Sequence, residues 1–474
     1  MRAGGERRWM EAARRPWGRL LLVLVCYAAL RPGLGPMALV FAAAVALASL
    51  WPRRRRSVLS GLAIAVCVVN IGPKWPWGAT DPNATRLAMR ALLVAGLWVG
   101  GLLAWTRLLA SLPRWIERHS LTLLHLGAAL FIGALWGTRA HSAMSGATAA
   151  ALCSLVPELL WRSSYWMKWR ARQAGPAGIW RNLFLTLPFL GSGGVPFGKG
   201  PAYIARYEAR DGNELASAQL EGLRLLLLAL AWRGVDALLG GLLWGSSSGW
   251  LPAWASFREP VLPTMEALLH TPDLFELWQR WAGLYSELIH AILTLAAYGH
   301  TIVGILCLMG IRIPRNTDAP LLSATILDFW NRYYFYFKEL LMDFFFFPSF
   351  LRTPGMPVLW RTMLATVAAA FLGNVYYHLL MYSQKLCAGD VSAFLSLASA
   401  RLVYCALLAG GLCFSFAGSL GKPAGPRKAG FPARLIRMAA VSTFFGVLHV
   451  WNYGSEDISL WQRLEFWKSL LTWN

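Results

Sequence analysis

Five histidines lie within or beside apolar stretches of this sequence: His125, His290, His300, His378 and His449. An ionisable side chain at membrane depth is costly, so each one is a candidate functional residue. A neutral imidazole can take a proton from a hydroxyl near pH 7, which makes general-base catalysis the chemistry to consider. The alternative is a histidine at the headgroup level, and residue type alone does not rank the five.

Residues 328–350, DFWNRYYFYFKELLMDFFFFPSF, combine many aromatic side chains with several charged ones. A fully lipid-exposed crossing could not hold so many charges, whereas an amphipathic helix lying at the membrane interface could. Helical spacing puts these polar residues on shared faces: Asp328 with Asn331 and Arg332, and Tyr334 with Lys338. We expect Pro348 and Pro354 to end this helix. The alternative is a plain interfacial anchor.

Residues 186–207, TLPFLGSGGVPFGKGPAYIARY, are rich in glycine and proline and cannot form a regular helix. At membrane depth such backbone must be buried in protein or line a wet cavity. The stretch is therefore either a simple loop or a re-entrant segment near a substrate chamber.

Apolar helices must position these residues, because the chain is 57% hydrophobic and only 14% charged. A soluble domain carries about 25% charged residues. Apolar runs recur along nearly the whole chain, which disfavours a large soluble core. The sequence predicts an all-α, polytopic transmembrane bundle of about 11 helices with re-entrant or interfacial helices. The expected crossings are 18–31, 36–51, 57–73, 89–107, 120–137, 143–161, 215–245, 282–311, 359–382, 393–418 and 433–452.

The net charge of +22 indicates membrane orientation rather than a nucleic-acid partner. Cytoplasmic loops collect Lys and Arg, and the basic clusters of the first half are separated by even numbers of expected crossings. All of them then fall on one side, with the N-terminus in the cytoplasm: Arg7 to Arg19, Arg53 to Arg56, Arg107 to Arg118 and Arg162 to Arg172. We expect the first apolar helix to be retained rather than cleaved as a signal peptide.

The seven cysteines are scattered, and no CxxC or Cys/His spacing typical of a metal site occurs. They are expected to be small packing residues, and no metal is expected. Residues 1–474 are interpreted as a single integral membrane domain. Within it, residues 1–172 are a generic helical scaffold, and the unusual residues lie in the second half.

The second half resembles the membrane-bound O-acyltransferase (MBOAT) family, in particular its bacterial alginate O-acetylase-like branch. The strongest similarity runs over residues 304–348, where eight residues fall at the family's spacing without gaps: Gly310, Ile311, Pro314, Phe329, Trp330, Arg332, Asp343 and Pro348. Residues 222–239 are similar to the family's preceding helix. The resemblance covers residues 186–474 and implies an MBOAT-like catalytic core there.

The family also has a membrane-embedded histidine in G-L-W-H-G, for which His378 is the collinear candidate and His449 the runner-up. The sequence differs from the family pattern at two positions within residues 328–350. Tyr334 replaces a histidine, and Asn331 replaces an arginine. These departures bear mainly on the identity of the substrate.

The resemblance implies acyl transfer from a thioester to a hydroxyl, with His378 as the base and Asn331 and Tyr334 orienting the reactants. Arg332 and Lys338 are candidates for binding the phosphates of the donor. No cofactor is expected to stay bound, and acyl-CoA, with acetyl-CoA favoured, would be a co-substrate. The resemblance also implies a tunnel from a cytoplasmic donor entrance to an acceptor on the opposite face.

The expected partners are the lipid bilayer, the acyl donor, an envelope or exported glycan or lipid as acceptor, and a periplasmic acyl-transfer protein. The expected location is the plasma membrane, as a multi-pass protein of the bacterial inner membrane. Two other readings stay open. One is a lipid or glycan transporter or flippase, which would more typically show paired broken helices in two halves. The other is a catalytically inactive MBOAT-like scaffold.

Overall fold

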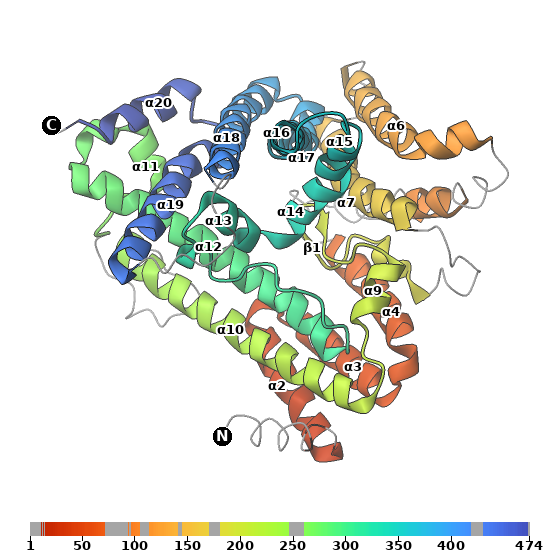
Figure 1. Ribbon diagram of the computed structural model, residues 1–474. Coiled ribbons are helices and arrows are strands. Elements are labelled where there is room, and N and C mark those ends of the chain that lie inside the picture. Colours follow the sequence, from red (N-terminus) through yellow and green to blue (C-terminus); the bar gives the residue numbers. More distant parts are fainter. Residues whose placement is uncertain are drawn as a thin grey trace. The chain divides into compact units, whose positions relative to one another are not determined.

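The computed structural model is almost entirely helical (Figure 1). It describes residues 11, 13, 15–71, 93, 96–104, 113–140, 145–169, 181–245, 260–418 and 430–472. Contacts divide the chain into two compact units. Unit 1 comprises residues 1–228, 300–314 and 383–390, and unit 2 comprises residues 229–299, 315–382 and 391–474. The division falls inside α10 and α12, whose 33 and 32 residues contribute to both units.

Unit 1 holds most of the first half of the chain and the end of α12. Its described elements are α2 (Pro16–Leu34), α3 (Met37–Leu50), η1 (Pro52–Arg54), α4 (Arg55–Ile71), α6 (Arg114–Ala140), α7 (Gly146–Trp169), η2 (Leu183–Leu185), β1 (Gly191–Ser192), β2 (Val195–Pro196), α9 (Pro201–Tyr207) and the first part of α10 (Gly212–Trp244). The helices α3 and α4 bend by 119° at their junction. Pro52 explains the break, because a proline disfavours helical backbone at the residue before it, and Trp51 has φ −120° and ψ 69°.

The glycine- and proline-rich stretch forms a tight hairpin rather than a helix. Ser192 pairs with Val195, and the two glycines between them have φ of 53° and 76°. A turn with two left-handed residues matches the twist of a hairpin and strongly favours glycine at both positions. The hairpin packs on α7, where Gly194 N–H donates to Glu158 Oε1 at 3.1 Å. Residues 194–197 are buried in protein, whereas Gly193 at the tip of the turn is exposed.

In unit 1, α10 and α12 (Leu277–Leu308) come together through two glycines. A Cβ added at Gly222 would lie 2.7 Å from the Gly304 carbonyl oxygen. Small residues let two helix backbones approach this closely, which is the usual packing device between membrane helices. The two helices lie side by side in Figure 1.

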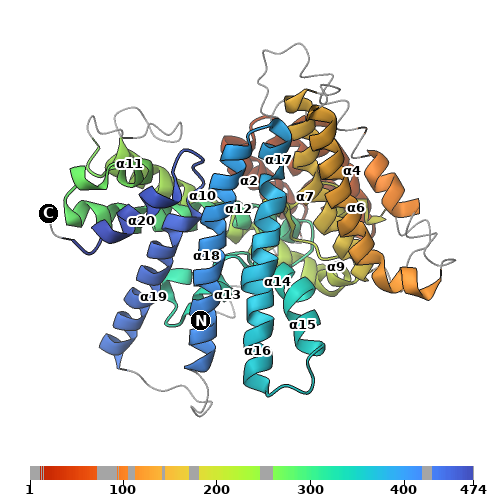
Figure 2. The ribbon, with the colours of Figure 1, turned by 90° about the horizontal axis from the view of Figure 1, so that it is seen from above.

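Unit 2 holds the second half of the chain apart from a few short segments. Its described elements are the remainder of α10 and α12, then α11 (Met265–His270), η4 (Pro272–Leu274), η5 (Pro320–Leu322), α13 (Ile326–Tyr333), α14 (Phe335–Leu341), η6 (Met342–Phe346), α15 (Phe347–Leu351), α16 (Val358–Val367), η7 (Ala368–Gly373), α17 (Asn374–Ala388), α18 (Val391–Ala417), α19 (Phe431–Asn452) and α20 (Leu460–Ser469). In Figure 2, α18 lies between α16 and α19 and contacts both. Only the last turns of α17 belong to unit 1.

The aromatic stretch is not the single helix that its sequence predicts. The chain breaks at Tyr334, with φ −139° and ψ 79°, and α13 and α14 flank the break. The preceding loop takes over the hydrogen bonds that a continuous helix would use: the Asn316 carbonyl accepts from Phe335 N at 2.8 Å, and Asp318 N donates to the Arg332 carbonyl at 2.9 Å. Pro348 lies in the first turn of α15 instead of ending a helix.

Seven helices among the described residues are long and apolar enough to cross a membrane, or eight if the bent α3–α4 pair is one span. They match seven of the expected crossings, and the expected 36–51 and 57–73 form the bent pair. The expected 143–161 is the helix α7, which is not among the seven. The expected 89–107 lies partly outside the described residues. The chain thus has the character of a multi-pass membrane protein, with fewer demonstrable spans than predicted.

Candidate functional site

A cavity of about 220 Å³ lies within unit 2 beside the aromatic stretch. Its lining residues are Leu327, Trp330, Asn331, Lys338, Leu341, Met342, Phe346, Thr366, Ala369, Ala370, Leu412 and Phe416. Most of this wall is apolar, so the few polar groups would set the orientation of any ligand. Two of these polar groups, Asn331 and Lys338, were singled out from the sequence.

Two π-helical segments, η6 and η7, supply residues on the cavity wall. Met342 and Phe346 come from η6, and Ala369 and Ala370 come from η7. A π-helical turn is rare and occurs frequently at functional sites, because it widens the helix at a cost in hydrogen-bond geometry. Two such segments on one small cavity mark it as the candidate substrate chamber of unit 2.

The charged residues at this end of unit 2 are largely compensated. Lys338 Nζ lies 2.7 Å from Glu339 Oε1 and 4.7 Å from the centroid of the Phe335 ring. Arg332 Nε donates to Asp328 Oδ1 at 2.8 Å, as the shared helical face predicts, and this pair is about 40% exposed. Arg332 is not among the cavity-lining residues. The structure therefore places Lys338 at the cavity and Arg332 on an outer face.

The two tyrosines after Arg332 take different positions around the break. Tyr334 forms the break itself, and its ring packs on Phe337 at 5.5 Å without reaching the cavity lining. Tyr333 ends α13, where burial raises the pKa of its phenol to about 12 and the nearby Arg401 opposes that rise. Tyr333 is therefore neutral near pH 7 and available as a hydrogen-bond donor.

His378 lies on α17, two turns beyond the cavity-lining part of η7, in an aromatic environment. Its ring stacks on Tyr382 at 5.9 Å and meets Tyr377 and Tyr404 edge-on at 5.2 and 6.3 Å. No described residue forms a hydrogen bond with its ring nitrogens. The described cavity lining does not include His378, so the structure does not bring it to Asn331 in that cavity.

A buried arginine, Arg401, forms a hydrogen bond with one of the aromatic side chains around His378. Arg401 Nε donates to Tyr382 Oη at 2.6 Å, and Nη1 donates to the Trp451 carbonyl at 3.0 Å. Through Tyr382, the guanidinium fixes the ring on which His378 stacks. Arg401 has no carboxylate within ion-pair distance among the described residues.

Asn374 stands one helical turn before His378 and shares its face of α17. Its side chain is fully buried, and neither amide atom has a hydrogen-bond partner among the described residues. An unsatisfied buried polar group costs about 1–3 kcal/mol. A polar group kept at that cost beside an unpartnered imidazole is typical of a functional site.

Three of the other candidate histidines have polar partners. His449 Nε2 lies 3.8 Å from Glu287 Oε1, and both side chains are mostly buried. His290 Nδ1 lies 2.7 Å from Asp236 Oδ1, and His125 Nε2 lies 2.9 Å from Ser164 Oγ. Each of these three rings therefore already has a polar partner within the protein. The geometry thus separates His378 from His449, the runner-up.

Sequence reasoning did not single out Arg401, Tyr382 or Tyr404 as site residues. One signal was present, because Arg401 is the only charged residue between Val391 and Ala417. An arginine inside a membrane-length apolar run is a functional candidate by default. The tyrosines carried no such signal, since aromatic residues are common throughout this chain.

No family model and no curated protein matches this chain.

Proposed function

We propose that the protein is an MBOAT-like O-acyltransferase, which moves an acyl group, with acetyl favoured, from a thioester donor to a hydroxyl of an envelope or exported glycan or lipid. The observation that supports this most is His378. Its ring has no hydrogen-bond or ion-pair partner among the described residues, unlike the rings of His125, His290 and His449, and it stands one helical turn from the buried Asn374 within a membrane-length helix. A base kept free of a protein partner can accept a proton from a substrate.

In the proposed reaction, His378 takes the proton of the acceptor hydroxyl as its oxygen attacks the thioester carbonyl carbon. The tetrahedral intermediate then collapses, the carbon–sulfur bond breaks, and the imidazolium returns the proton to the leaving thiolate. The developing oxyanion needs hydrogen-bond donors in a dry site, where they contribute most. Asn331 and Tyr334 are the proposed orienting residues, and they would have to approach His378 in the substrate-bound protein.

The donor is proposed to be acyl-CoA, used as a co-substrate and not retained as a cofactor. Lys338 lines the unit 2 cavity and is the better placed of the two proposed phosphate-binding cations, because Arg332 faces outward. A periplasmic acyl-transfer protein is a further proposed partner. The proposed location is the bacterial inner membrane, with the N-terminus in the cytoplasm.

The test uses the purified full-length protein in lipid nanodiscs, with acetyl-CoA labelled in its acetyl group and an envelope extract as acceptor. We expect release of free CoA that depends on the extract, together with label in one glycan or lipid fraction. The same fraction should lose the mass of an acetyl group in cells that lack the protein. Folded protein that releases no CoA with acetyl-CoA or longer acyl donors would overturn the proposal and favour a transporter or an inactive scaffold.

A further inference from the structure

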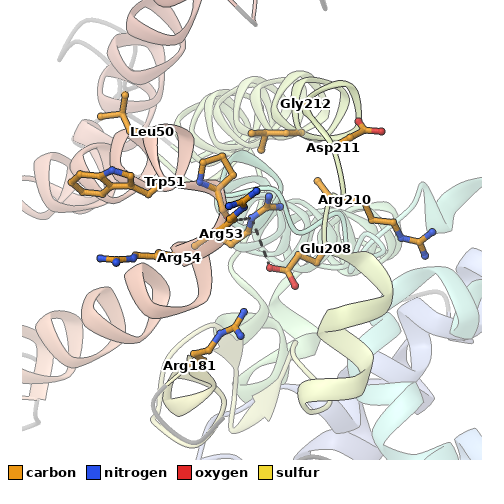
Figure 3. A pocket seen from close by; sticks show the side chains of 13 residues that line it. Leu50, Trp51, Arg53, Arg54, Arg181, Glu208, Arg210, Asp211 and Gly212 are labelled. Atoms are coloured by element: carbon orange, nitrogen blue, oxygen red, sulfur yellow. Dashed lines mark hydrogen bonds and ion pairs between the residues drawn. The ribbon is translucent and has the colours of Figure 1, made fainter. Parts of the chain in front are cut away.

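Unit 1 contains an open cleft of about 820 Å³ around η1, at the bend between α3 and α4 (Figure 3). The start of α10 and the loop before it form the opposite side. The lining residues are Leu50, Trp51, Pro52, Arg53, Arg54, Arg55, Arg181, Glu208, Ala209, Arg210, Asp211, Gly212 and Leu215. Arginine is the most frequent residue in this lining.

The carboxylates of this cleft are already engaged. Glu208 Oε2 accepts from Arg56 at 2.6 and 2.9 Å, and its other oxygen lies 3.8 Å from Arg55 Nε. Asp211 Oδ1 accepts the backbone N–H groups of Asn213 and Glu214 at 2.7 and 2.8 Å. Glu208 is thus compensated by Arg55 and Arg56, and Asp211 caps the start of α10.

Four arginines of the cleft are exposed and have no carboxylate within ion-pair distance among the described residues: Arg53, Arg54, Arg181 and Arg210. They come from three separate segments of the chain. In Figure 3, Arg54 and Arg210 extend on opposite sides of Glu208, and Arg181 points towards it from below. Guanidinium groups spread in this way suit a ligand that carries more than one anionic group.

A buried scaffold fixes the base of the cleft. Arg55 Nε donates to the Pro52 carbonyl at 2.7 Å, and Nη1 donates to the Gly310 carbonyl at 3.1 Å. Gly310 has a φ of +84°, and a Cβ there would lie 2.5 Å from Arg55 Nη1. Only glycine fits this position. The hydrogen bond from Arg55 to the Gly310 carbonyl holds the start of α4 to the segment that carries Gly310. The four exposed arginines therefore project from a preformed base.

One rim of the cleft is apolar and belongs to a membrane-length helix pair. Leu50 and Trp51, at the end of α3, are 62% and 56% exposed. An exposed tryptophan at the end of an apolar helix is typical of the membrane–water interface, where the ring is apolar and the N–H meets water. The arginines beside it would then lie at the depth of the phospholipid phosphates.

We propose that this cleft binds the headgroup of an acidic phospholipid, with the phosphates on the exposed arginines and the acyl chains along Leu50 and Trp51. We choose cardiolipin as this lipid, because its two phosphates would engage guanidinium groups on both sides of Glu208. A soluble polyphosphate would use the same cations but would leave the apolar rim unoccupied. This inference does not depend on the proposed acyl transfer.

The test measures lipid binding to the full-length protein by native mass spectrometry in an uncharged detergent. The probes are short-chain cardiolipin, short-chain phosphatidylcholine and inorganic pyrophosphate. The cleft variant is Arg54→Gln with Arg210→Gln. The matched control is Arg434→Gln with Arg437→Gln, two exposed arginines of α19 whose loss changes the net charge equally. Arg54→Lys with Arg210→Lys keeps both charges at the cleft.

The proposal expects cardiolipin to bind more tightly than phosphatidylcholine. An interfacial arginine contributes roughly a fivefold change in affinity, so the cleft variant should bind cardiolipin about 25-fold more weakly. The control and lysine variants should stay within about threefold of the original protein. Equal weakening by the cleft and control variants would overturn the proposal, as would no weakening in the cleft variant. Pyrophosphate binding that needs the cleft arginines while cardiolipin binding does not would also overturn it.

Discussion

The exposed arginines at the cleft of unit 1 differ from the buried arginines of unit 2. Around the cleft of unit 1, four arginines are exposed and carry no described carboxylate partner. In unit 2, Arg401 and Arg463 are buried, and both donate to backbone carbonyls at the end of α19. A helix C-terminus carries partial negative charge, which favours a cation there. The net charge of the chain thus combines arginines available to ligands with arginines that hold the fold.

Arg463 should give the largest effect on stability, because it is fully buried and binds three carbonyls. It donates to Val450, Tyr453 and Ser455, the last two at 3.1 Å. Burial lowers the pKa of Arg463 to about 10, so it is still charged at neutral pH. Replacing it with Met should lower the free energy of unfolding by about 4–5 kcal/mol, because three carbonyls lose their buried donor.

Chemical unfolding of Arg463→Met in detergent measures this effect, with the exposed Arg434→Met as the control. A loss no larger than in the control would contradict the idea that buried arginines of unit 2 hold the end of α19.

Arg401→Gln should give the next largest effect, a loss of about 3 kcal/mol. It removes the hydrogen bonds to Tyr382 and to the Trp451 carbonyl, and hydrogen bonds from charged groups contribute about 1.5–3 kcal/mol each. Tyr382→Phe removes only the first of these bonds and should cost about half as much. Unfolding of both variants under the same conditions separates the two contacts, and equal losses would refute the assignment of the Trp451 contact.

Glu208 pairs with Arg55 and Arg56 and also lines the cleft with the exposed arginines, so Glu208→Gln should affect both stability and ligand binding. It should cost about 1–2 kcal/mol, because Arg55 and Arg56 lose their carboxylate while keeping their other hydrogen bonds. Removing this negative charge should also raise the affinity of the cleft for cardiolipin, since Glu208 opposes anion binding there. Unfolding and native mass spectrometry report the two effects, and weaker lipid binding in a folded variant would count against the cleft.

Arg332→Gln should give the smallest effect. Its ion pair with Asp328 is about 40% exposed, and exposed pairs contribute at most about 0.5–1 kcal/mol. We expect a change within about 0.5 kcal/mol by chemical unfolding. A larger loss would show that this arginine belongs with the buried group.

Much of the helical architecture follows from the sequence, because long uncharged runs in a chain of this composition must be helices. The ion pair between Asp328 and Arg332 follows from helical spacing. The hairpin turn was not predicted, although the sequence carries a signal for it, since Gly193 and Gly194 follow Ser192 directly. These features depend only on neighbours along the chain.

The features that sequence reasoning missed depend on residues far apart in the chain. The break at Tyr334 arises because the loop at Asn316 supplies other hydrogen-bond partners. The environment of His378 depends on Arg401, which reaches it through Tyr382. No periodicity encodes such contacts, so the helix that carries His378 could be predicted but its surroundings could not.

The proposed chemistry is tested most directly by measuring the transfer of labelled acetyl from acetyl-CoA to an envelope extract. The measurement compares the original protein with His378→Gln. General-base catalysis contributes about 100-fold to 10,000-fold, so the variant should lose at least 100-fold in rate. Its free energy of unfolding and its cardiolipin affinity should stay unchanged, and His449→Gln should keep most of the activity. A folded His378→Gln protein that transfers acetyl at the original rate would contradict the account.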